Sequence, residues 1–307
     1  MSEDQLVRLL AATIAMGTPL VFAAFGEILA ESSGVLNLGV EGMMLVGAVS
    51  AFIVVVTTGN PWLGAGAGML AAGALAAGHA LLCVTLRADQ VTAGLALALF
   101  GGGLASFLGK TYVGVPNPKP FVAIALPGLS ALPVVGRSVF TQDALVYVSY
   151  VLIPLGWWWL YRTRPGLHLR ACGESPGTAD AMGVVVVAIR YASVIAGGMF
   201  AGLGGAYLSL AYVPAWTENM TAGLGWIALA LVIFAGWNPL PLVFGAYLFG
   251  GVEAIGFRAQ LLGIPVNTIV LRMMPYLVTL GVMLLAALWR RRLAMPSALG
   301  LPYAREE

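Results

Sequence analysis

Apolar runs long enough to cross a bilayer constrain this chain more than any other feature. They fall near residues 9–29, 35–56, 62–86, 91–109, 143–161, 186–212, 219–236, 240–257 and 268–289. A spanning helix needs about 20 mostly apolar residues. Spanning strands would have to close into a barrel, and these runs are too long and too uniformly apolar for that. The sequence therefore predicts an all-α polytopic membrane protein with about nine helices, with eight to ten compatible with the pattern.

Composition supports the same class. Hydrophobic residues make up 60% of the chain and charged residues only 9%, whereas soluble domains carry roughly 25% charged residues. The two cysteines, Cys83 and Cys172, are too far apart in sequence for a CxxC site and are expected to be small apolar fillers. His79 and His168 lack metal-ligand spacing. No nucleophile stands beside a base, so we expect a non-enzymatic chain that binds no cofactor, metal or nucleic acid.

Basic residues set the expected orientation, because Lys and Arg favour the cytoplasmic side. With the polar segment 162–185 placed inside, nine Lys and Arg residues fall inside and six outside. This places the N-terminus outside and a short, frayed tail at 293–307 inside, after one transmembrane domain at 1–292. The proline-rich segment 110–142 is expected to be an extracytoplasmic loop. The start of the chain is more acidic than basic and its first apolar run continues as a span, so no cleavable signal peptide is predicted.

Two stretches depart from a plain spanning helix. The first, 26–48, carries Glu27, Glu31, Asn37 and Glu41 among apolar residues. In the second, 214–238, the apolar part at 225–236 has 12 residues, which is about 18 Å of helix and too short to cross alone. Both are predicted to be broken or re-entrant helices that line a cavity. Their corresponding positions in the two halves suggest an inverted repeat around a central site.

Four polar residues in these stretches are candidates for a translocation path. An ionisable side chain within a span costs several kcal/mol unless it meets water or a partner. Asn37 and Glu41 can therefore line the path, or they can satisfy backbone groups where the helix breaks. Glu218 and Asn219 have the same two readings, the second being a helix cap.

A stripe of small residues marks a predicted helix contact. Gly198, Gly202 and Ala206 recur every four residues and share one helix face. Such a stripe lets two helix backbones approach closely. The contact can lie within the chain, which we favour, or between subunits.

The polar segment 162–185 carries several arginines and a helix-start signal. Ser175 is a candidate cap and Pro176 a first helical residue, so a short surface helix is expected near 178–182, ending at Gly183. A helix of this kind between two spans suits docking into another protein. The alternative is a plain solvated connection. Its candidate docking residues are Arg170, Gly173, Glu174, Ser175, Pro176, Asp180 and Gly183.

Four stretches carry a resemblance to a known family: ESSGVLNLGVEGMMLVGA at 31–48, RADQVTAGLAL at 87–97, RPGLHLRACGESPGTADAMGV at 164–184, and GLGGAYLSLAYVPAWTENMTAGLGWIALALVIFAGWNPL at 202–240. Together they resemble inner-membrane permeases of ABC importers, in the simple-sugar and nucleoside branch related to ribose and branched-chain amino-acid permeases. Glu174 and its neighbours match the segment that contacts the ATPase in that family, with Ser175 in place of the usual asparagine.

The resemblance implies a function and a set of partners. The chain would be the permease subunit of an ATP-driven importer in the bacterial-type inner membrane, working by alternating access. Its partners would be a cytoplasmic ATPase dimer that holds ATP and Mg, a second permease that is a homologous but different chain, and an extracytoplasmic solute-binding lipoprotein. Nucleosides, purine-like solutes or simple sugars are the expected cargo.

Two other functions compete with this interpretation. An ion-coupled secondary transporter of a small polar solute would need intramembrane acids, for which Glu41 and Glu253 are the candidates. A membrane scaffold that transports nothing would have no use for the polar breaks near 31–41 and 217–223.

Overall fold

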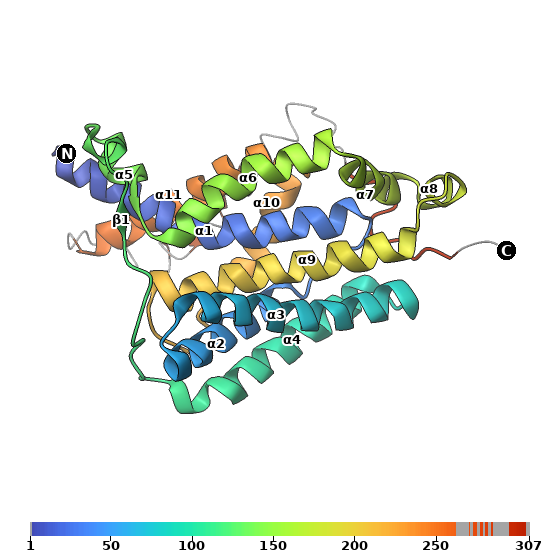
Figure 1. Ribbon diagram of the computed structural model, residues 1–307, viewed down its shortest axis with the longest axis horizontal. Coiled ribbons are helices and arrows are strands. Elements are labelled where there is room, and N and C mark those ends of the chain that lie inside the picture. Colours follow the sequence, from blue (N-terminus) through green and yellow to red (C-terminus); the bar gives the residue numbers. More distant parts are fainter. Residues whose placement is uncertain are drawn as a thin grey trace.

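The computed structural model describes residues 2–261 and 295–304, together with a few isolated positions between 270 and 284. The described part is built from helices that run roughly parallel to one another (Figure 1). Seven helices within it are long and apolar enough to span a membrane: α1 (Glu3–Ser32), α2 (Val40–Thr58), α3 (Pro61–Ala80, continued by a π-helical turn at Leu81–Thr85), α4 (Gln90–Gly109), α6 (Ala144–Arg162), α9 (Val186–Tyr207, continued by a π-helical turn at Leu208–Tyr212) and α11 (Pro239–Leu261). The predicted all-α polytopic class is confirmed.

Two of the nine predicted spans are not among these seven helices. The run at 219–236 forms only the 12-residue helix α10 (Leu224–Ala235), preceded by turns. It is therefore a partial span of about 18 Å, as the position of its glycines predicts. The predicted span at 268–289 lies outside the residues that the structure continuously describes.

Helix ends follow local capping chemistry. The Asn60 side chain accepts a hydrogen bond from the backbone N–H of Trp62 at 3.0 Å, and Pro61 occupies the first turn of α3. Asp143 caps α6 in the same way, through the N–H of Leu145 at 2.9 Å. These side chains satisfy backbone donors that a helix cannot pair internally. The sequence prediction started the first helix at residue 9, but a capping box at Ser2 starts α1 at Glu3.

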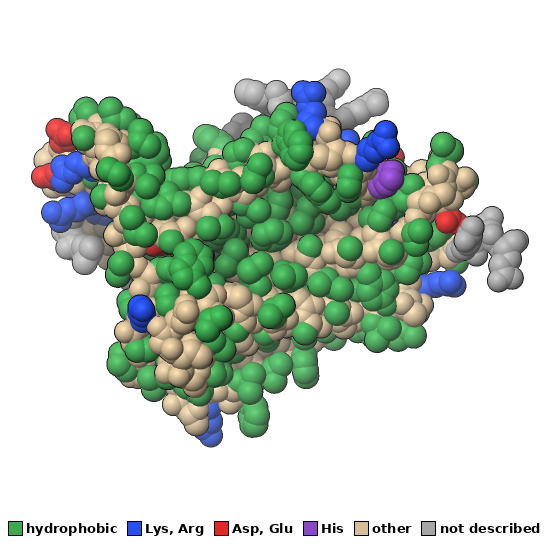
Figure 2. All heavy atoms as spheres, in the orientation of Figure 1, with side chains coloured by type: hydrophobic (Ala, Val, Ile, Leu, Met, Phe, Trp, Pro, Cys, Tyr) green, Lys and Arg blue, Asp and Glu red, His purple; other side chains and the backbone are tan. Residues whose placement is uncertain are grey.

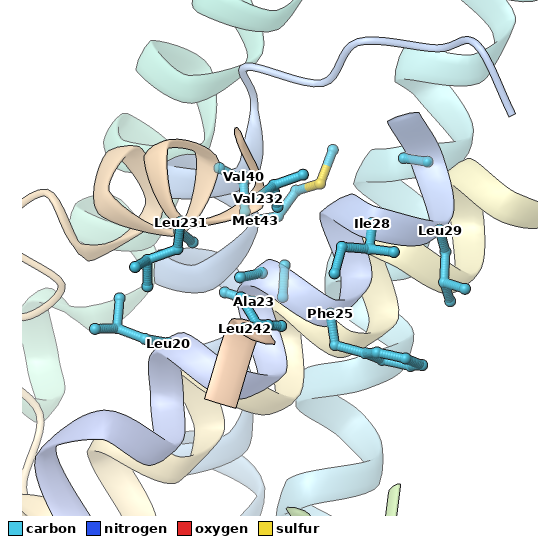
Figure 3. Close-up of a cluster of buried hydrophobic side chains, with 14 of the residues drawn as sticks. Leu20, Ala23, Phe25, Ile28, Leu29, Val40, Met43, Leu231, Val232 and Leu242 are labelled. Atoms are coloured by element: carbon cyan, nitrogen blue, oxygen red, sulfur yellow. The ribbon is translucent and has the colours of Figure 1, made fainter. Parts of the chain in front are cut away.

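The core lies where α1 and α9 cross beside α2, α3, α10 and α11. Helices α1 and α9 run antiparallel, since Ser33 lies beside Ser193 while Pro19 lies beside Gly204. Figure 3 shows apolar side chains from four helices meeting in this core. The labelled residues are Leu20, Ala23, Phe25, Ile28 and Leu29 of α1, Val40 and Met43 of α2, Leu231 and Val232 of α10, and Leu242 of α11.

Small residues set the spacing between α9 and its neighbours. A methyl group added at Gly198 would collide with Ala76 of α3, and one added at Gly202 would collide with Ala72 and the carbonyl of Gly68. The Cβ of Ala206 faces Gly68 as well. The predicted stripe at Gly198, Gly202 and Ala206 thus lies in a contact within the chain, between α9 and α3.

The two broken connections contain the same parts in the same order. In each, a long helix ends, a non-helical segment follows (33–39 or 213–223), and an apolar helix begins after a glycine N-cap, Gly39 or Gly223. Helix α3 packs on α9, and α11 packs on α1. This equivalence supports the predicted inverted repeat. The predicted helix starts at 35 and 219 were too early, because both segments remain extended or in turns up to these glycines.

The bundle has two distinct ends. One carries the N-terminus, the two-stranded hairpin β1–β2 (Ile124–Ala125 and Thr141–Gln142) and the short helix α5 (Val135–Val139). We call this the hairpin end. The other carries α7 (Arg164–Glu174), α8 (Pro176–Ala181) and the C-terminal segment 295–304. We call this the α7–α8 end. Charged side chains gather at both ends and apolar ones cover the sides (Figure 2), as expected for a bundle that crosses a membrane.

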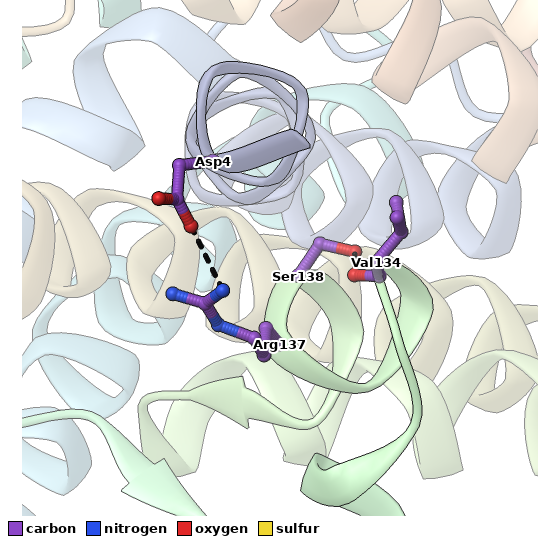
Figure 4. Close-up of polar contacts among 4 residues, drawn as sticks. All are labelled: Asp4, Val134, Arg137 and Ser138. Carbon is purple, nitrogen blue, oxygen red and sulfur yellow. Dashed lines mark hydrogen bonds and ion pairs between the residues drawn. The ribbon is translucent and has the colours of Figure 1, made fainter. Parts of the chain in front are cut away.

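The proline-rich segment is fixed against the hairpin end. The Phe121 N–H donates to the carbonyl of Leu210 at 2.9 Å, and Pro116 forms an isolated β-bridge with Ala215. Arg137 of α5 pairs with Asp4 of α1 at 2.8 Å (Figure 4). Both side chains of this pair are exposed, so it adds little stability.

Candidate functional site

The two broken connections meet at Glu41, in the first turn of α2. Its carboxylate accepts hydrogen bonds from the Thr221 hydroxyl at 2.5 Å and from the backbone N–H groups of Gly223 at 2.9 Å and Gly225 at 2.7 Å. A side chain on Gly225 would collide with the Glu41 backbone. The buried carboxylate of α2 therefore caps the N-terminus of α10, where backbone donors and the helix dipole favour a negative charge.

Glu218 and Asn219 lie in the turns that precede this contact. Both are exposed, and neither caps α10, because Glu41 of α2 occupies that position. Asn219 has a positive φ of 53°, a left-handed conformation that Asn tolerates better than most residues. Of the four predicted path residues, these two reach the surface, while Asn37 and Glu41 are buried.

Asn37 bridges the first break to α1. Its Nδ2 donates to Oε1 of Glu27 at 2.8 Å, and its Oδ1 accepts from the N–H of Gly39 at 3.1 Å. The second oxygen of Glu27 is buried without a hydrogen-bond partner among the described residues. Four residues on in α1, Glu31 accepts a hydrogen bond from the indole N–H of Trp237 at 2.6 Å. The carboxylate of Glu27 thus holds the first break, and that of Glu31 holds the residues that follow α10.

Glu27 and Glu31 lie in the first of the two predicted breaks, but they were not among the four residues predicted for the translocation path. Their spacing of four residues within an apolar run places them on one helix face, and this was the signal that could have selected them. A third contact holds the break at Leu36, whose N–H donates to Gln90 Oε1 at 2.7 Å and whose carbonyl lies 3.0 Å from Nε2 of His79. The described residues contain no cluster of three or more metal-ligand side chains.

The segment 162–185 forms two helices, α7 and α8, where the sequence predicted one short helix. Helix α8 begins at Pro176 and ends before Gly183, which has a positive φ of 84°. Helix α7 was not predicted, and Pro165 and Gly166 near its start do not prevent it from forming. Pro165 lies in the first turn, where a proline is tolerated, and the Thr163 hydroxyl accepts from the N–H of Gly166 at 3.3 Å.

The predicted docking residues differ in exposure: Gly173 is buried, Arg170, Pro176 and Asp180 are half-buried, and Glu174, Ser175 and Gly183 are exposed. Arg170 Nε donates to the carbonyl of Leu160 at 3.1 Å, and its guanidinium lies 4.8 Å from the centre of the Tyr161 ring. Gly173 packs against Ser32 and Gly34 so closely that a side chain would clash. Glu174 accepts a hydrogen bond from the Ser297 hydroxyl at 2.7 Å.

The exposed surface of this segment also includes apolar residues that are not among the predicted docking residues. Met182 is 80% exposed and Val185 is 67% exposed. They follow α8 at the tip of the α7–α8 end (Figure 1). An exposed apolar patch at the end of a bundle is typical of a contact with another protein.

The C-terminal segment 295–304 is bound to this end, although the sequence predicted a frayed tail. Backbone N–H groups donate from Ala298 to Gly173 at 2.8 Å and from Gly300 to Gly34 at 3.2 Å. The Tyr303 hydroxyl lies 3.0 Å from Asp180 Oδ2. The segment therefore joins α7, α8 and the first break.

Buried Arg190 of α9 completes this junction. Its guanidinium donates to the carbonyls of Ser33 at 3.1 Å and Leu301 at 3.2 Å, while Nη2 has no partner among the described residues. The nearby Cys172 thiol is also buried. Burial raises its pKa, and the positive charge of Arg190 offsets part of that increase.

Comparison with known proteins identifies the family. Residues 9–287 match the family described as the permease component of branched-chain amino acid transport systems. A putative glucose ABC transporter permease of Haloferax volcanii is 44% identical, over 97% of this chain and 98% of its own length. A guanosine ABC transporter permease of Bacillus subtilis is 32% identical, over 96% and 95%. A nucleoside ABC transporter permease of Lactococcus lactis is 34% identical, over 94% of each chain. No solved structure matches significantly.

The family match covers nearly all of the described bundle, and each of the three relatives covers more than nine-tenths of the chain. The long apolar helices agree with a transport role. The chain therefore belongs to the branched-chain amino acid transport system permease family, as a multi-pass plasma-membrane permease subunit of the ABC transporter type.

Proposed function

We propose that this permease serves an importer of nucleosides or simple sugars, with the α7–α8 end in the cytoplasm. The family implies association with an ABC ATPase and a substrate-binding protein. In our proposal, the chain itself binds no cofactor, and the ATPase dimer holds ATP and Mg. The binding protein is a lipoprotein that docks at the hairpin end, and the second permease is a homologous but different chain.

One observation carries the coupling proposal: α7 touches the first broken connection directly. Gly173 packs on Ser32 and Gly34, so a displacement of α7 reaches the break at 33–39 without an intermediate. Within the break, Asn37 accepts a hydrogen bond from the N–H of Gly39, and Glu41, two residues further on, holds α10. Movement at the α7–α8 end is thereby transmitted to the point where the two broken connections meet.

The exposed residues Met182 and Val185 form the proposed docking surface for the ATPase. A carboxylate placed in an apolar interface is costly because it loses its water. Met182→Asp should therefore abolish ATP-driven uptake in vesicles that contain the complete transporter, and should weaken co-purification of the ATPase. Val122→Asp, an equally drastic change at the exposed hairpin end, serves as the control for the ATPase contact. Co-purification that Met182→Asp leaves unchanged would contradict the docking assignment.

The same vesicles separate this function from ion-coupled transport. Uptake should require ATP on the side of the membrane that carries the ATPase. It should persist when an uncoupler removes the proton gradient. Glu41 does not provide a free intramembrane acid, because both of its carboxylate oxygens accept hydrogen bonds from the α10 region. Uptake that collapses with the uncoupler and ignores ATP would overturn the proposal.

The relatives suggest the cargo. Glucose is named for one relative, and guanosine and nucleosides are named for two others. Both classes are polar, uncharged and rich in hydroxyl groups. Competition of unlabelled guanosine and glucose against labelled solute in the same vesicles distinguishes them, and inhibition by neither would refute this choice of cargo.

A further inference from the structure

A pocket opens in the side of the bundle near the α7–α8 end, beside the junction of α1, α7 and α9. It has a volume of about 430 Å³, within the usual range of small-molecule pockets. Residues of α1, α6, α7 and α9 line it, among them Leu29, Trp159, Leu169, Ile189, Ala192 and Ala196. Its walls are therefore predominantly apolar.

Two basic side chains line the same pocket. Arg164 and His168 are exposed and lie one turn apart on α7. No acidic residue lines the pocket. Within the described part of the chain, neither Arg164 nor His168 forms an ion pair. An apolar slot with an unpaired basic rim is complementary to a molecule that joins an apolar body to a negative head group.

The position of the pocket defines its depth in the bilayer. Helix α6 ends at Arg162, and three consecutive tryptophans, 157–159, lie within its last two turns. Trp and Tyr gather where the hydrocarbon meets the head groups. Because Trp159 also lines the pocket, the mouth lies at head-group level, and Arg164 and His168 lie just beyond it. Blue and purple side chains gather at this place over α7 in Figure 2.

We propose that this pocket binds an anionic phospholipid. The phosphate lies against Arg164 and His168, since a guanidinium is well suited to bind phosphate oxygens. One acyl chain lies along Leu29, Ile189 and Ala196. Basic pockets between helices at the cytoplasmic membrane surface are a common site for anionic head groups. The location of the mouth in the bilayer favours a membrane lipid over a soluble phosphate.

The bound lipid would border the coupling path. Ser193 lines the pocket, and its hydroxyl donates to the hydroxyl of Ser33 at 2.7 Å, at the start of the first break. Leu29 lies one turn before that break. Occupancy of the pocket therefore adds packing beside the junction of α1, α7 and α9.

Native mass spectrometry of the full chain tests the proposal. The purified, delipidated protein is titrated with phosphatidylglycerol or phosphatidylcholine, for the wild type and for Arg164→Gln/His168→Gln. The wild type should bind phosphatidylglycerol in preference to phosphatidylcholine. The double variant should bind phosphatidylglycerol about tenfold more weakly, as expected for loss of a charge-assisted hydrogen bond, with a smaller loss for phosphatidylcholine, whose choline cation offsets the phosphate charge.

Two further variants keep the test specific. Arg162→Gln removes an exposed arginine that stacks on Trp157 and does not line the pocket, so it should bind like the wild type. Ala196→Phe fills the slot and should weaken binding of both lipids. Equal loss with Arg162→Gln would overturn the site, because general surface charge would then explain binding.

The occupant is tested separately. Glycerol 3-phosphate at millimolar concentration should not displace phosphatidylglycerol, since it lacks the acyl chain that fills the slot; complete displacement would assign the site to a soluble phosphate instead. A photo-crosslinker at position 168 in the assembled transporter should capture lipid. Capture of the second permease in place of lipid would assign this face to the subunit interface and refute the proposal.

Discussion

The carboxylate of Glu41 lies 2.7 Å from the backbone nitrogen of Gly225, so the first turn of one broken helix holds the first turn of the other. The two residues are separated by 184 positions in the sequence. Removing the carboxylate would leave the hydroxyl of Thr221 and the N–H groups of Gly223 and Gly225 without that acceptor.

We therefore expect Glu41→Ala to destabilise the protein by at least about 2 kcal/mol, since each unsatisfied buried donor costs about 1–3 kcal/mol. Glu41→Gln should be intermediate, because its amide retains one acceptor but directs a donor at other donors. Thermal unfolding in detergent measures both. Glu218→Ala, at the exposed turn, should leave the unfolding temperature unchanged. An alanine variant at 41 as stable as the wild type would contradict the capping role.

Gly202 offers a test of helix spacing. Its substitution by alanine places a methyl group against Ala72 and the Gly68 carbonyl, and overpacking of this kind costs about 1–3 kcal/mol. Gly66 of α3 has open space around its Cα, so Gly66→Ala should be neutral or stabilising by up to about 1 kcal/mol through helix propensity. Opposite signs in thermal unfolding are the expected result, and equal effects would argue against the close contact of α9 with α3.

Arg190 should control the attachment of the C-terminal segment. Arg190→Met keeps an apolar stem of similar length but loses the donors to Ser33 and Leu301. Hydrogen exchange of the amides of Ala298 and Gly300, which bind across to Gly173 and Gly34, should then become faster. Arg162→Met, at an exposed position, is the matched control. Unchanged exchange in the first variant would show that the segment is held without Arg190.

Cys172 should be chemically inert in the folded protein. Burial raises its pKa, so at neutral pH the fraction of reactive thiolate is even smaller than for a free cysteine. Maleimide labelling, followed by mass spectrometry, should be slow at pH 7 and should accelerate as the pH rises. Thr178→Cys, at an exposed position of α8, should label rapidly under the same conditions. Rapid modification of Cys172 at pH 7 would contradict its packing beneath α8.

Asp89 should make the start of α4 sensitive to acid. The Thr92 hydroxyl and N–H donate to its carboxylate at 2.6 and 2.8 Å, which lowers the pKa of Asp89. A lowered pKa stabilises the folded state above the unfolded pKa of about 3.9, and this contribution is lost as the pH falls through the folded pKa. Asp89→Ala should therefore lower the unfolding temperature at pH 7, and the difference should shrink below about pH 4. A constant difference would exclude the charge as its source.

Periodicity and length predicted much of the fold. The apolar runs located α1, α2, α3, α4, α6, α9 and α11, and glycine positions indicated that the segment ending at residue 236 forms only a short helix. Local rules also predicted α8 from Pro176 and Gly183. These features depend on residues near one another in sequence, so the pattern alone contains them.

Contacts between distant segments were beyond the sequence pattern. Whether Glu41 faces a path or caps a helix depends on α10, which follows it by more than 180 residues. The C-terminal segment 295–304 carries two prolines and a glycine that interrupt any helical pattern, and its fixed position comes from contacts with Gly173, Gly34 and Arg190. Trp237 likewise gives no local sign of its bond with Glu31. A single sequence indicates that such polar residues need partners, but not which partners they find.

The close glycine contacts along α9 have a consequence for how a transporter of this shape can change state. Backbones that meet without intervening side chains cannot slide past each other without opening gaps on both sides, so α1, α3 and α9 form a stiff frame. Conformational change then falls to the joints at 33–39 and 213–223, where helices are already interrupted. Small molecules or mutations that rigidify these two non-helical segments would therefore stop transport without affecting solute binding or the ATP site of the partner.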